Sequence, residues 1–596
     1  MASSIKDKDQ DVESKSLEGD LDPDTVPTEH ELATLRRVPA AMPWPALLLC
    51  FAELAERASY YGTSGLFFNF VKNPLPKGGS GTGAVPRGDA YKNAKPGALG
   101  KGLVAANAVT TTFTFLSYVI PIVGAILADT RWGRYKAVWV GTLVGIFAHI
   151  LIVVPAIPAV IKVPDASLAL LIVSIMVLAF AAGFLKPSIS PLLCDQVTVK
   201  RPTIRVQKNG ERVIVDPETT IGRWLMIFYL SVNIGCFFSI ATTYAERFVG
   251  FWLGLFLPGI VYAFVPIVLL LIKNRLQHAP PQGSVVLEAL GVLRILLADG
   301  GIWKALRGGG DAFWDRARPS YIAKHNNVAH PEKVFWDDLF VDEIRRTVSA
   351  CGFFVLLPIY NLAQLGIASQ LGAMSVSMVL NHIPNDIMAN FNPLGVVVGS
   401  PLLTYGFYPF MAYIGYPLAP MTRISIGFVI GSIGSTIAAI VQWKIYQTSP
   451  CGWYATSCDD VSKVSIAWLI PILVIPAIGE LMVNVTAYEV AYTHAPARMK
   501  GLVFALCLFS TAISAAFSLA CAGLIKDPWL VWPWVALTVA ALICAVIFPT
   551  YFRHMNKAPH TWNDEARQAG KLTGFTLNKT EAARVEEEVS PELRKY

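Results

Sequence analysis

Residues 43–71 read PWPALLLCFAELAERASYYGTSGLFFNFV and combine an apolar stretch of membrane length with three charged side chains. A helix that crosses a bilayer needs about 20 mostly apolar residues, and this stretch satisfies that length. Glu53, Glu56 and Arg57 nevertheless stand within five residues of one another. Because a charge at the centre of a bilayer costs about 2.5–3.5 kcal/mol on insertion scales, these charges indicate a helix that turns a polar face toward the interior of a helical bundle.

The composition of the whole chain agrees with a membrane protein. The chain has 596 residues, of which 54% are hydrophobic and only 15% are charged. A soluble protein of this length carries a larger charged fraction. Apolar stretches of about 18–25 residues recur along the chain, as expected for membrane-spanning helices. The sequence therefore predicts an all-α polytopic membrane protein.

The apolar stretches number twelve and fall into two groups of six. The first group covers 43–71, 103–128, 135–157, 167–194, 222–245 and 250–273, and the second covers 348–372, 386–415, 422–446, 463–492, 501–525 and 531–553. Two groups of six spans around a polar connector are typical of a transporter whose substrate binds between two halves. We expect an N-terminal six-helix bundle at 43–273, a cytoplasmic connector at 274–347 and a C-terminal six-helix bundle at 348–555.

Both ends of the chain are polar. Residues 1–42 have no apolar core, which argues against a cleavable signal peptide, and their acidic, serine-rich start predicts a disordered tail. Residues 556–596 are similar. An even number of spans places both tails on one side, together with the basic segments 129–136 and 200–213. The positive-inside rule then predicts that both tails are cytoplasmic.

The connector contains one helical pattern, VVLEALGVLRILLADGGIWKAL at 285–306. We expect this helix to lie along the membrane surface.

Helical spacing places Glu53, Arg57, Tyr60 and Ser64 on one face of the first span, with Glu56 at its edge. One interpretation is a salt bridge that only fixes helix packing. Two acids to one arginine leave one carboxylate without a local partner, however. Burial disfavours the charged form of such a carboxylate, and this favours a proton-binding site.

Other spans carry isolated polar groups at membrane depth. Lys186 precedes a proline in the fourth span, Asn233 interrupts the fifth, Asn392 precedes a proline in the eighth, and Glu480 lies in the tenth. An acid in one half and cations in the other would give a cavity two electrical poles. Such poles suit a zwitterion, with its amine toward Glu480 and its carboxylate toward Arg57 and Lys186.

The sequence argues against several other kinds of site. The nine cysteines form no metal-ligand cluster, and most stand singly in apolar spans as small packing residues. Cys451 and Cys458 lie in a polar loop and would form a disulfide if that loop faces an oxidising compartment. We find no phosphate-binding glycine loop, nucleophile elbow or basic patch interleaved with aromatics. We therefore expect no enzyme, no metal, no cofactor and no nucleic-acid partner.

Five motifs carry a resemblance to a known family. ELAERASYYG at 53–62 resembles the ExxERFxYYG motif of the proton-coupled oligopeptide transporter (POT) family of the major facilitator superfamily. The other four motifs also resemble signatures of this family: GAILADTRWGRYK at 124–136, GFLKPSISPLLCDQ at 183–196, IFYLSVNIG at 227–235 and ELMVNVTAYEVAYTHAP at 480–496. The glycine-rich loop after the first span and the long connector are similar to the fungal branch. The resemblance implies the major facilitator fold, with twelve transmembrane helices in two six-helix halves.

The resemblance also implies roles for residues at the matching positions. Glu53, Glu56 and Arg57 would form the proton-coupling triad, and Lys186 would assist coupling and bind the substrate carboxylate. Glu480 and Asn392 would hold the substrate amino terminus. The remaining implied positions are the pocket-lining residues Tyr60, Tyr61, Tyr118 and Asn233 and the cytoplasmic gate residues Asp129, Arg131 and Arg134.

The chain departs from the family pattern at several positions. Many members carry a second arginine where this chain has Ser64, and an acid where it has Leu365, beside Gln364. These two groups are thought to pair as an outer gate. Losing both avoids stranding one buried charge, which costs about 3–5 kcal/mol, and the outer gate must then close by other contacts. Animal members have a histidine where this chain has Thr111, so proton coupling here would depend on the carboxylates.

The resemblance implies a proton-coupled symporter that imports di- and tripeptides by alternating access. Its partners would be peptides, protons and membrane lipids, and we expect it to function as a monomer in the plasma membrane. One alternative is the same fold carrying nitrate or a specialised metabolite, although Glu480 favours a substrate with an amine. Another is a peptide sensor that transports nothing.

Overall fold

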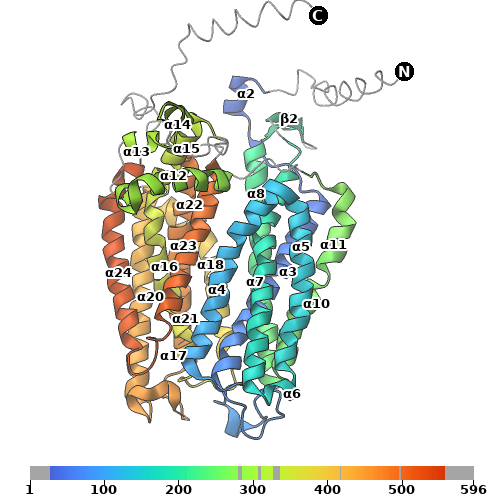
Figure 1. The fold of residues 1–596 in the computed structure, drawn as a ribbon, viewed down its shortest axis with the longest axis vertical. Coiled ribbons are helices and arrows are strands. Elements are labelled where there is room, and N and C mark those ends of the chain that lie inside the picture. The colour runs from blue at the N-terminus through green and yellow to red at the C-terminus, as the bar shows by residue number, and fades with distance from the viewer. Residues whose placement is uncertain are drawn as a thin grey trace, which may run out of the picture.

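A computed structural model describes residues 27–199, 202–207, 210–278, 285–306, 311–325, 336–416, 418–458, 460–495 and 499–556. The C-terminal tail expected at 556–596 lies outside the described residues from residue 557 onward, and the N-terminal tail lies outside them up to residue 26. The described chain is a bundle of long, roughly parallel helices (Figure 1).

Six membrane-length stretches of helix make up the first half. They are α3 (Trp44–Lys72), α4 (Gly102–Leu127) continued by the π-helical η3 (Ala128–Trp132), α5 (Arg134–Val153), α7 (Pro164–Asp195), α8 (Pro217–Cys236) followed by α9 (Phe238–Phe248), and α10 (Phe251–Tyr262) followed by α11 (Val265–Ile272). A short helix, α6 (Pro158–Ile161), connects α5 to α7.

The helices of the second half are more often interrupted. They are η7 (Gly352–Leu356), α16 (Leu357–Leu365) and α17 (Gln370–Ser375); η8 (Asn385–Asn390), α18 (Phe391–Pro401), η9 (Leu402–Phe407) and α19 (Tyr408–Tyr413); α20 (Pro420–Thr448); α21 (Leu469–Glu480), η12 (Leu481–Val485) and α22 (Thr486–His494); α23 (Lys500–Cys521); and α24 (Val531–Thr550).

The lengths and composition of these helices confirm an all-α, multi-pass membrane protein. Ten helical segments of the described chain are long and apolar enough to cross a membrane. The first predicted span, α3, is equally long but carries Glu53, Glu56 and Arg57, and α23 contributes a shorter apolar stretch, Ala505–Cys521. Together with the ten, these two account for the twelve predicted spans.

The break between α16 and α17 has a local cause. Gly366, Ala368 and Ser369 all have positive φ, at 77°, 48° and 56°. A left-handed backbone cannot continue a right-handed helix, so the chain turns directly after Leu365. The seventh span is therefore split at the position where the resemblance places the family's acid.

The helices of the first half approach closely where glycines face each other. A Cβ added to Gly124 of α4 would lie 2.1 Å from the carbonyl oxygen of Gly183 on α7. Small residues allow such close backbone approach between membrane helices. Separate clusters of buried apolar side chains fill the two halves, one around Phe113 and Phe251 and the other around Phe428 and Trp534.

A small sheet closes one end of the bundle. It consists of β1 (Arg37–Val38), β2 (Thr203–Val206) and β3 (Arg212–Val215), in the order β1-β3-β2, with β1 parallel and β2 antiparallel to β3. The short helix α2 (Glu29–Thr34) precedes β1 and starts with a capping box between Thr28 and Glu31.

We expected residues 1–42 to form a disordered tail, but the described part of this segment contains α2 and β1. The described part of that tail is structured because β1 pairs with β3, far along the chain, and because Arg212 forms a 2.8 Å salt bridge with Glu31. The composition of residues 1–42 does not reveal either partner.

The connector also lies at this end of the molecule. It forms α12 (Val285–Leu306), α13 (Asp311–Asp315), α14 (Pro319–His325) and α15 (Asp338–Ala350), and Figure 1 shows these helices over the second half. Val292 of α12 packs in one cluster with Ile344 of α15 and Leu502 of α23, which anchors the connector to the bundle. We refer to this end as the α2 end, and to the opposite end, where α6 and α17 lie, as the α6 end.

The close approach of α4 and α7 gives a test of the packing. We expect Gly124→Ala to lower the free energy of unfolding by about 1–3 kcal/mol, because the added methyl group overlaps backbone atoms that cannot move aside. The matched control is Gly222→Ala on α8, where an added Cβ meets nothing within 4 Å. The control should be neutral or slightly stabilising. Thermal unfolding of the purified variants in detergent measures both, and equal midpoints would contradict the packing.

Candidate substrate and proton site

Two carboxylates share one arginine in the middle of α3. Glu53 and Glu56 are each 2% exposed, and 15% of the Arg57 side chain is exposed. The Arg57 Nε lies 2.7 Å from Glu53 Oε1, to which it donates a hydrogen bond, and 3.0 Å from Glu56 Oε2. The helical spacing of the sequence thus brings the three predicted groups into direct contact.

The neighbouring helix α8 approaches this triad through a glycine. A Cβ on Gly235 would lie 2.5 Å from the carbonyl oxygen of Leu54 and 2.7 Å from Arg57 Cβ. Only glycine fits without displacing α3. The NIG segment of the predicted fifth span therefore has a packing role beside the triad.

The triad contains more acceptors than donors. Glu53 Oε2 and both carboxylate oxygens of Glu56 are buried and have no hydrogen-bond donor among the described residues. Burying a carboxylate without a donor is costly. A proton on one of the two carboxyl groups would remove that cost, so the arrangement is suited to bind one.

Lys186 of α7 lies on the other side of this group. Its Nζ is buried and has no hydrogen-bond acceptor among the described residues. It lies 3.9 Å from the centre of the Tyr60 ring and 5.1 Å from that of Tyr118. Cation–π contacts of this kind attract a lysine ammonium to the ring faces. Lys186 is also close enough to interact electrostatically with Glu53 and Glu56. The predicted cation of the fourth span therefore belongs to the same site as the triad.

The second half contributes Glu480, the last residue of α21. Gln364 of α16 donates a hydrogen bond of 2.5 Å from its Nε2 to Glu480 Oε2. The Tyr360 hydroxyl donates to the Pro476 carbonyl at 2.6 Å and holds α16 against α21. The role of Gln364 could not be predicted from the sequence, although this residue stands beside Leu365, where many family members carry an acid. Leu365 itself is 50% exposed.

The remaining predicted pocket residues occupy different environments. Tyr118 lies beside Lys186 and is close enough to both Arg57 and Glu480 to interact with them electrostatically. Tyr61 is 37% exposed. Asn233 donates to the Tyr229 carbonyl of its own helix at 2.8 Å, whereas the buried Nδ2 of Asn392 has no acceptor among the described residues.

Two positions that bear on proton coupling lie nearby. Thr111, where animal members have a histidine, is 5% exposed. The Nε2 of His149 lies 2.8 Å from the Ser59 hydroxyl, and its ring contacts Tyr262. This geometry fits a packing and hydrogen-bonding histidine.

The predicted cytoplasmic gate residues lie at the α2 end. Arg134 Nη1 donates to Asp195 Oδ1 and Oδ2 at 2.6 and 2.7 Å, and its Nε lies 3.7 Å from Asp129 Oδ1. Arg131 is exposed. Asp195, at the end of α7, was missed as a partner, although it stands in the quoted LLCDQ segment.

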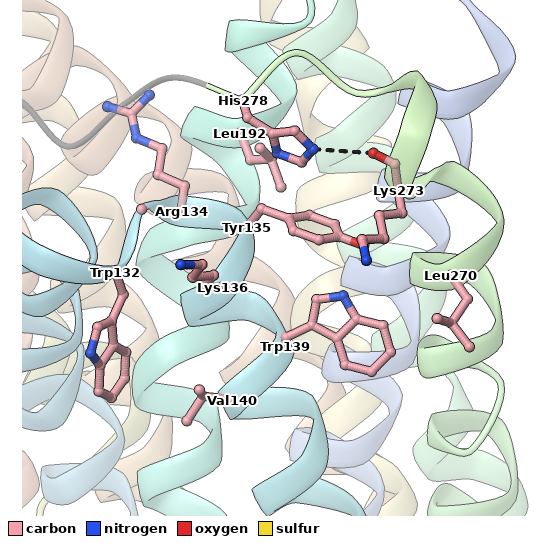
Figure 2. A pocket seen from close by; sticks show the side chains of 11 residues that line it. Trp132, Arg134, Tyr135, Lys136, Trp139, Val140, Leu192, Leu270, Lys273 and His278 are labelled. Carbon is pink, nitrogen blue, oxygen red and sulfur yellow. Dashed lines mark hydrogen bonds between the residues drawn. The ribbon is translucent and has the colours of Figure 1, made fainter.

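A pocket of about 740 Å³ opens beside Arg134, between α5 and α11. Figure 2 shows Arg134 pointing away from Tyr135 and Lys273, and a hydrogen bond from the His278 ring to the Lys273 carbonyl. Arg134 thus lines one side of this pocket, while its guanidinium pairs with Asp195 and lies near Asp129.

A disulfide joins Cys451 and Cys458 at the α6 end of the second half. The other seven cysteines are free.

Comparison with known proteins identifies the family. A family model described as "POT family" matches residues 135–535, more than half of the chain. The chain belongs to the POT family. Curated relatives extend the match over nearly the whole length. The peptide transporter PTR2 of Candida albicans is 38% identical over 89% of this chain and 85% of its own, and PTR2 of Saccharomyces cerevisiae is 31% identical over 90% and 83%.

Another relative has a less specific name. The MFS-type transporter ucsM of an Acremonium species is 39% identical, over 92% of this chain and 90% of its own. Among solved structures, the POT family transporter PepTSo superposes with a TM-score of 0.64 at 20% identity, over 87% of this chain and 99% of that one. This likeness confirms the fold predicted from the resemblance.

The bond between Gln364 and Glu480 gives a test of how the second-half pole is built. We expect Gln364→Leu to destabilise the substrate-free protein by about 1–3 kcal/mol, because it removes the hydrogen bond from Gln364 to the partly buried carboxylate of Glu480. The double variant Gln364→Leu/Glu480→Leu should recover most of this loss, since it removes the acceptor as well. Thermal unfolding of the two single variants and the double variant completes the cycle. Additive losses would show that the two side chains do not interact.

Proposed function

We propose that this protein is a proton-coupled symporter that imports di- and tripeptides by alternating access. The observation that carries the proposal is the triad, in which Glu53 and Glu56 compete for Arg57 in the middle of a membrane span. Membership of the POT family supports it, as do the names of the relatives in Candida albicans and Saccharomyces cerevisiae, both peptide transporters.

In this mechanism the proton and the substrate act on the same arginine. Protonation of Glu53 or Glu56 neutralises one carboxylate and weakens its hold on Arg57. The guanidinium is then free to donate to the substrate carboxylate, and bidentate pairing makes arginine well suited to this contact. When the substrate leaves, the proton is released and the salt bridge forms again.

The second pole would orient the peptide. Lys186 would add a second cation for the carboxylate, and Glu480, held by Gln364, would receive the amino terminus. Tyr118 would line the space between the poles, because it interacts with both. Asn392, with a buried amide that has no acceptor among the described residues, would serve the substrate backbone or amino terminus.

The same reasoning supports an orientation. We place the α2 end in the cytoplasm, where the positive-inside rule puts the basic segments around Arg131 and Arg212. The α6 end then faces outward, and its Cys451–Cys458 disulfide would face the oxidising side, where disulfides persist. We further propose that the protein resides in the plasma membrane and works as a monomer, by transport alone and without catalysis.

The driving force is adequate for accumulation. A proton that moves inward gains about 2.3 kcal/mol per 100 mV of membrane potential, in addition to any pH gradient. A neutral zwitterion adds no charge of its own to this balance. The potential alone can therefore concentrate the substrate.

A second candidate function is the transport of a different small substrate. The name of the relative ucsM, an MFS-type transporter, states no substrate and is compatible with this function. Nitrate has no amine for Glu480, so the second pole favours peptides over nitrate. The sensor alternative differs from both because it predicts no flux at all.

We expect Glu53→Gln to abolish acid-driven accumulation of dipeptide in proteoliposomes while sparing counterflow exchange. The amide cannot exchange a proton but can still accept a hydrogen bond from Arg57, so alternating access without a gradient should continue. Wild-type protein with the gradient collapsed by a protonophore is the control. Accumulation by the variant that matched wild type would contradict the coupling role.

Competition against labelled dipeptide uptake tests the substrate class. Unlabelled tripeptides should compete, whereas nitrate and N-acetylated dipeptides should not, because neither carries an amine for Glu480. Glu480→Gln should remove the preference for the free amine over the acetylated form. Competition by nitrate, or the same preference in the variant, would favour the alternative substrate.

A further inference from the structure

A second group of buried acids joins the two halves at the α6 end. Asn69, three residues before the end of α3, lies between Glu246 of α9 and the Asn385–Asp386 pair of η8. Asn69 is 0% exposed, Glu246 1% and Asn385 2%, and Asp386 is partly buried. Because α9 belongs to the first half and η8 to the second, the group forms part of the contact that holds this end together.

The amide of Asn69 has too few hydrogens for its contacts. Its Nδ2 lies 3.1 Å from Glu246 Oε1, 2.9 Å from Asn385 Oδ1 and 2.5 Å from Asp386 Oδ2. A primary amide has only two N–H hydrogens. One is used by the reciprocal pair with Asn385, whose Nδ2 donates back to Asn69 Oδ1 at 3.0 Å. A single hydrogen remains for two carboxylate oxygens.

The basic groups nearby are directed elsewhere. Arg247, next to Glu246, donates to the carbonyls of Ala94 and Lys92 at 2.9 and 3.3 Å. Lys72 donates to the Thr456 carbonyl at 3.2 Å. Neither forms an ion pair with Glu246 or Asp386 among the described residues.

The helices packed on this group add no further charge close to it. Among the residues of α10, α17 and α18 there is no acid or base, and the one acid of α21, Glu480, is its last residue and belongs to the other site. Elsewhere at this end, His382 lies 3.4 Å from Asp89 and Lys101 pairs with Asp165, both at the surface. Arg247 is close enough to act electrostatically on Glu246, but neither Glu246 nor Asp386 forms an ion pair with a base among the described residues. The two acids therefore face each other across one amide.

We propose that Glu246 and Asp386 form a proton-binding site that closes the outer gate. The two carboxylate oxygens share one nitrogen, so they can be no farther apart than the sum of their distances to it. Two ionised carboxylates at such a separation repel each other. A proton on either carboxyl group removes one charge and supplies the donor that Asn69 lacks, so the joined state of the halves binds one proton more than the separated state.

This inference rests on the proposed function for its orientation, with the α6 end outside. It also accounts for the missing pair at Ser64 and Leu365, where the family's arginine and acid would pair across the outer gate. A gate held by a shared proton closes in response to external acid. Since one proton is involved, the ratio of closed to open molecules should change by up to about tenfold per pH unit.

The test is a distance measurement across the outer gate as a function of pH. Lys162, after α6, and Gln447, near the end of α20, are exposed and lie on opposite halves. Each is replaced by a keto amino acid that carries a spin label, which leaves the native cysteines in place. Double electron–electron resonance in nanodiscs without substrate is then recorded between about pH 5 and about pH 8.

We expect acid to shift the wild-type distribution toward the short, closed distance. Glu246→Gln and Asp386→Asn should each hold the short distance across the range, or move the midpoint by about one pH unit or more, because the new amide donates without a proton. The matched control is Ser239→Ala. This variant removes the neutral 2.7 Å hydrogen bond from Ser239 to Asn390 in the same interface, and it should weaken closure at every pH without changing the pH dependence.

The proposal would be overturned by a wild-type distance that does not respond to pH, or by an unchanged pH response in both Glu246→Gln and Asp386→Asn. It would also be overturned if the closed distance were lost when choline replaces Na⁺ at constant pH, because the acids would then bind Na⁺ and not a proton. Peptide uptake by the same samples separates this proposal from the function proposed above. Absent uptake with an intact gate response would remove only the peptide function. Normal uptake with no gate response would remove only the gate site. Glu53→Gln should keep the gate response, and its loss there would show that the triad controls the gate.

Discussion

Glu53 and Glu56 share Arg57 in the middle of α3, and this shared ion pair determines how the neighbouring helices must pack. A helix with three charges cannot face lipid without a large penalty, so α3 must be surrounded by other helices. Gly235 lets α8 approach to contact distance, and Lys186 on α7 brings a second cation, held over the Tyr60 ring. The bundle of the first half can thus be understood as the environment that makes the triad tolerable in a membrane.

In the second half, the acid that belongs to this site is Glu480. Glu480 is held by a neutral amide, Gln364, and not by a cation. If a cation paired with Glu480, the pair would have no net charge and would attract a substrate amine only weakly. A carboxylate held by an amide keeps its charge available while satisfying part of its hydrogen-bonding capacity. The split of the seventh span after Leu365 and the bond from Tyr360 to Pro476 fix Gln364 in reach of that acid.

Local patterns were sufficient to predict much of this arrangement. The twelve spans follow from apolar length, and the contact of Glu53 with Arg57 follows from i, i+4 spacing on one helix. Partners distant in sequence could not be predicted in the same way: Asp195 for Arg134, Gln364 for Glu480 and β3 for β1 depend on how helices and strands meet. The site formed by Asn69, Glu246 and Asp386 could not be predicted from the sequence. Each residue stands near the end of a span, where polar residues are common, and only the structure shows that the three meet across the two halves.

The change at the outer gate has a physical logic of its own. A gate of arginine and acid is strongest when both groups are charged, so external acid weakens it by protonating the acid. A gate of two acids behaves in the opposite sense, because protonation is what allows Glu246 and Asp386 to share the amide of Asn69. In the proposed symporter, which protons from outside would drive, the second arrangement would close the outer side under the conditions that also protonate the triad. With the arginine and acid absent at Ser64 and Leu365, and Glu246 and Asp386 in their place, protonation would then favour closure of the outer gate, whereas it would oppose closure by an arginine and an acid.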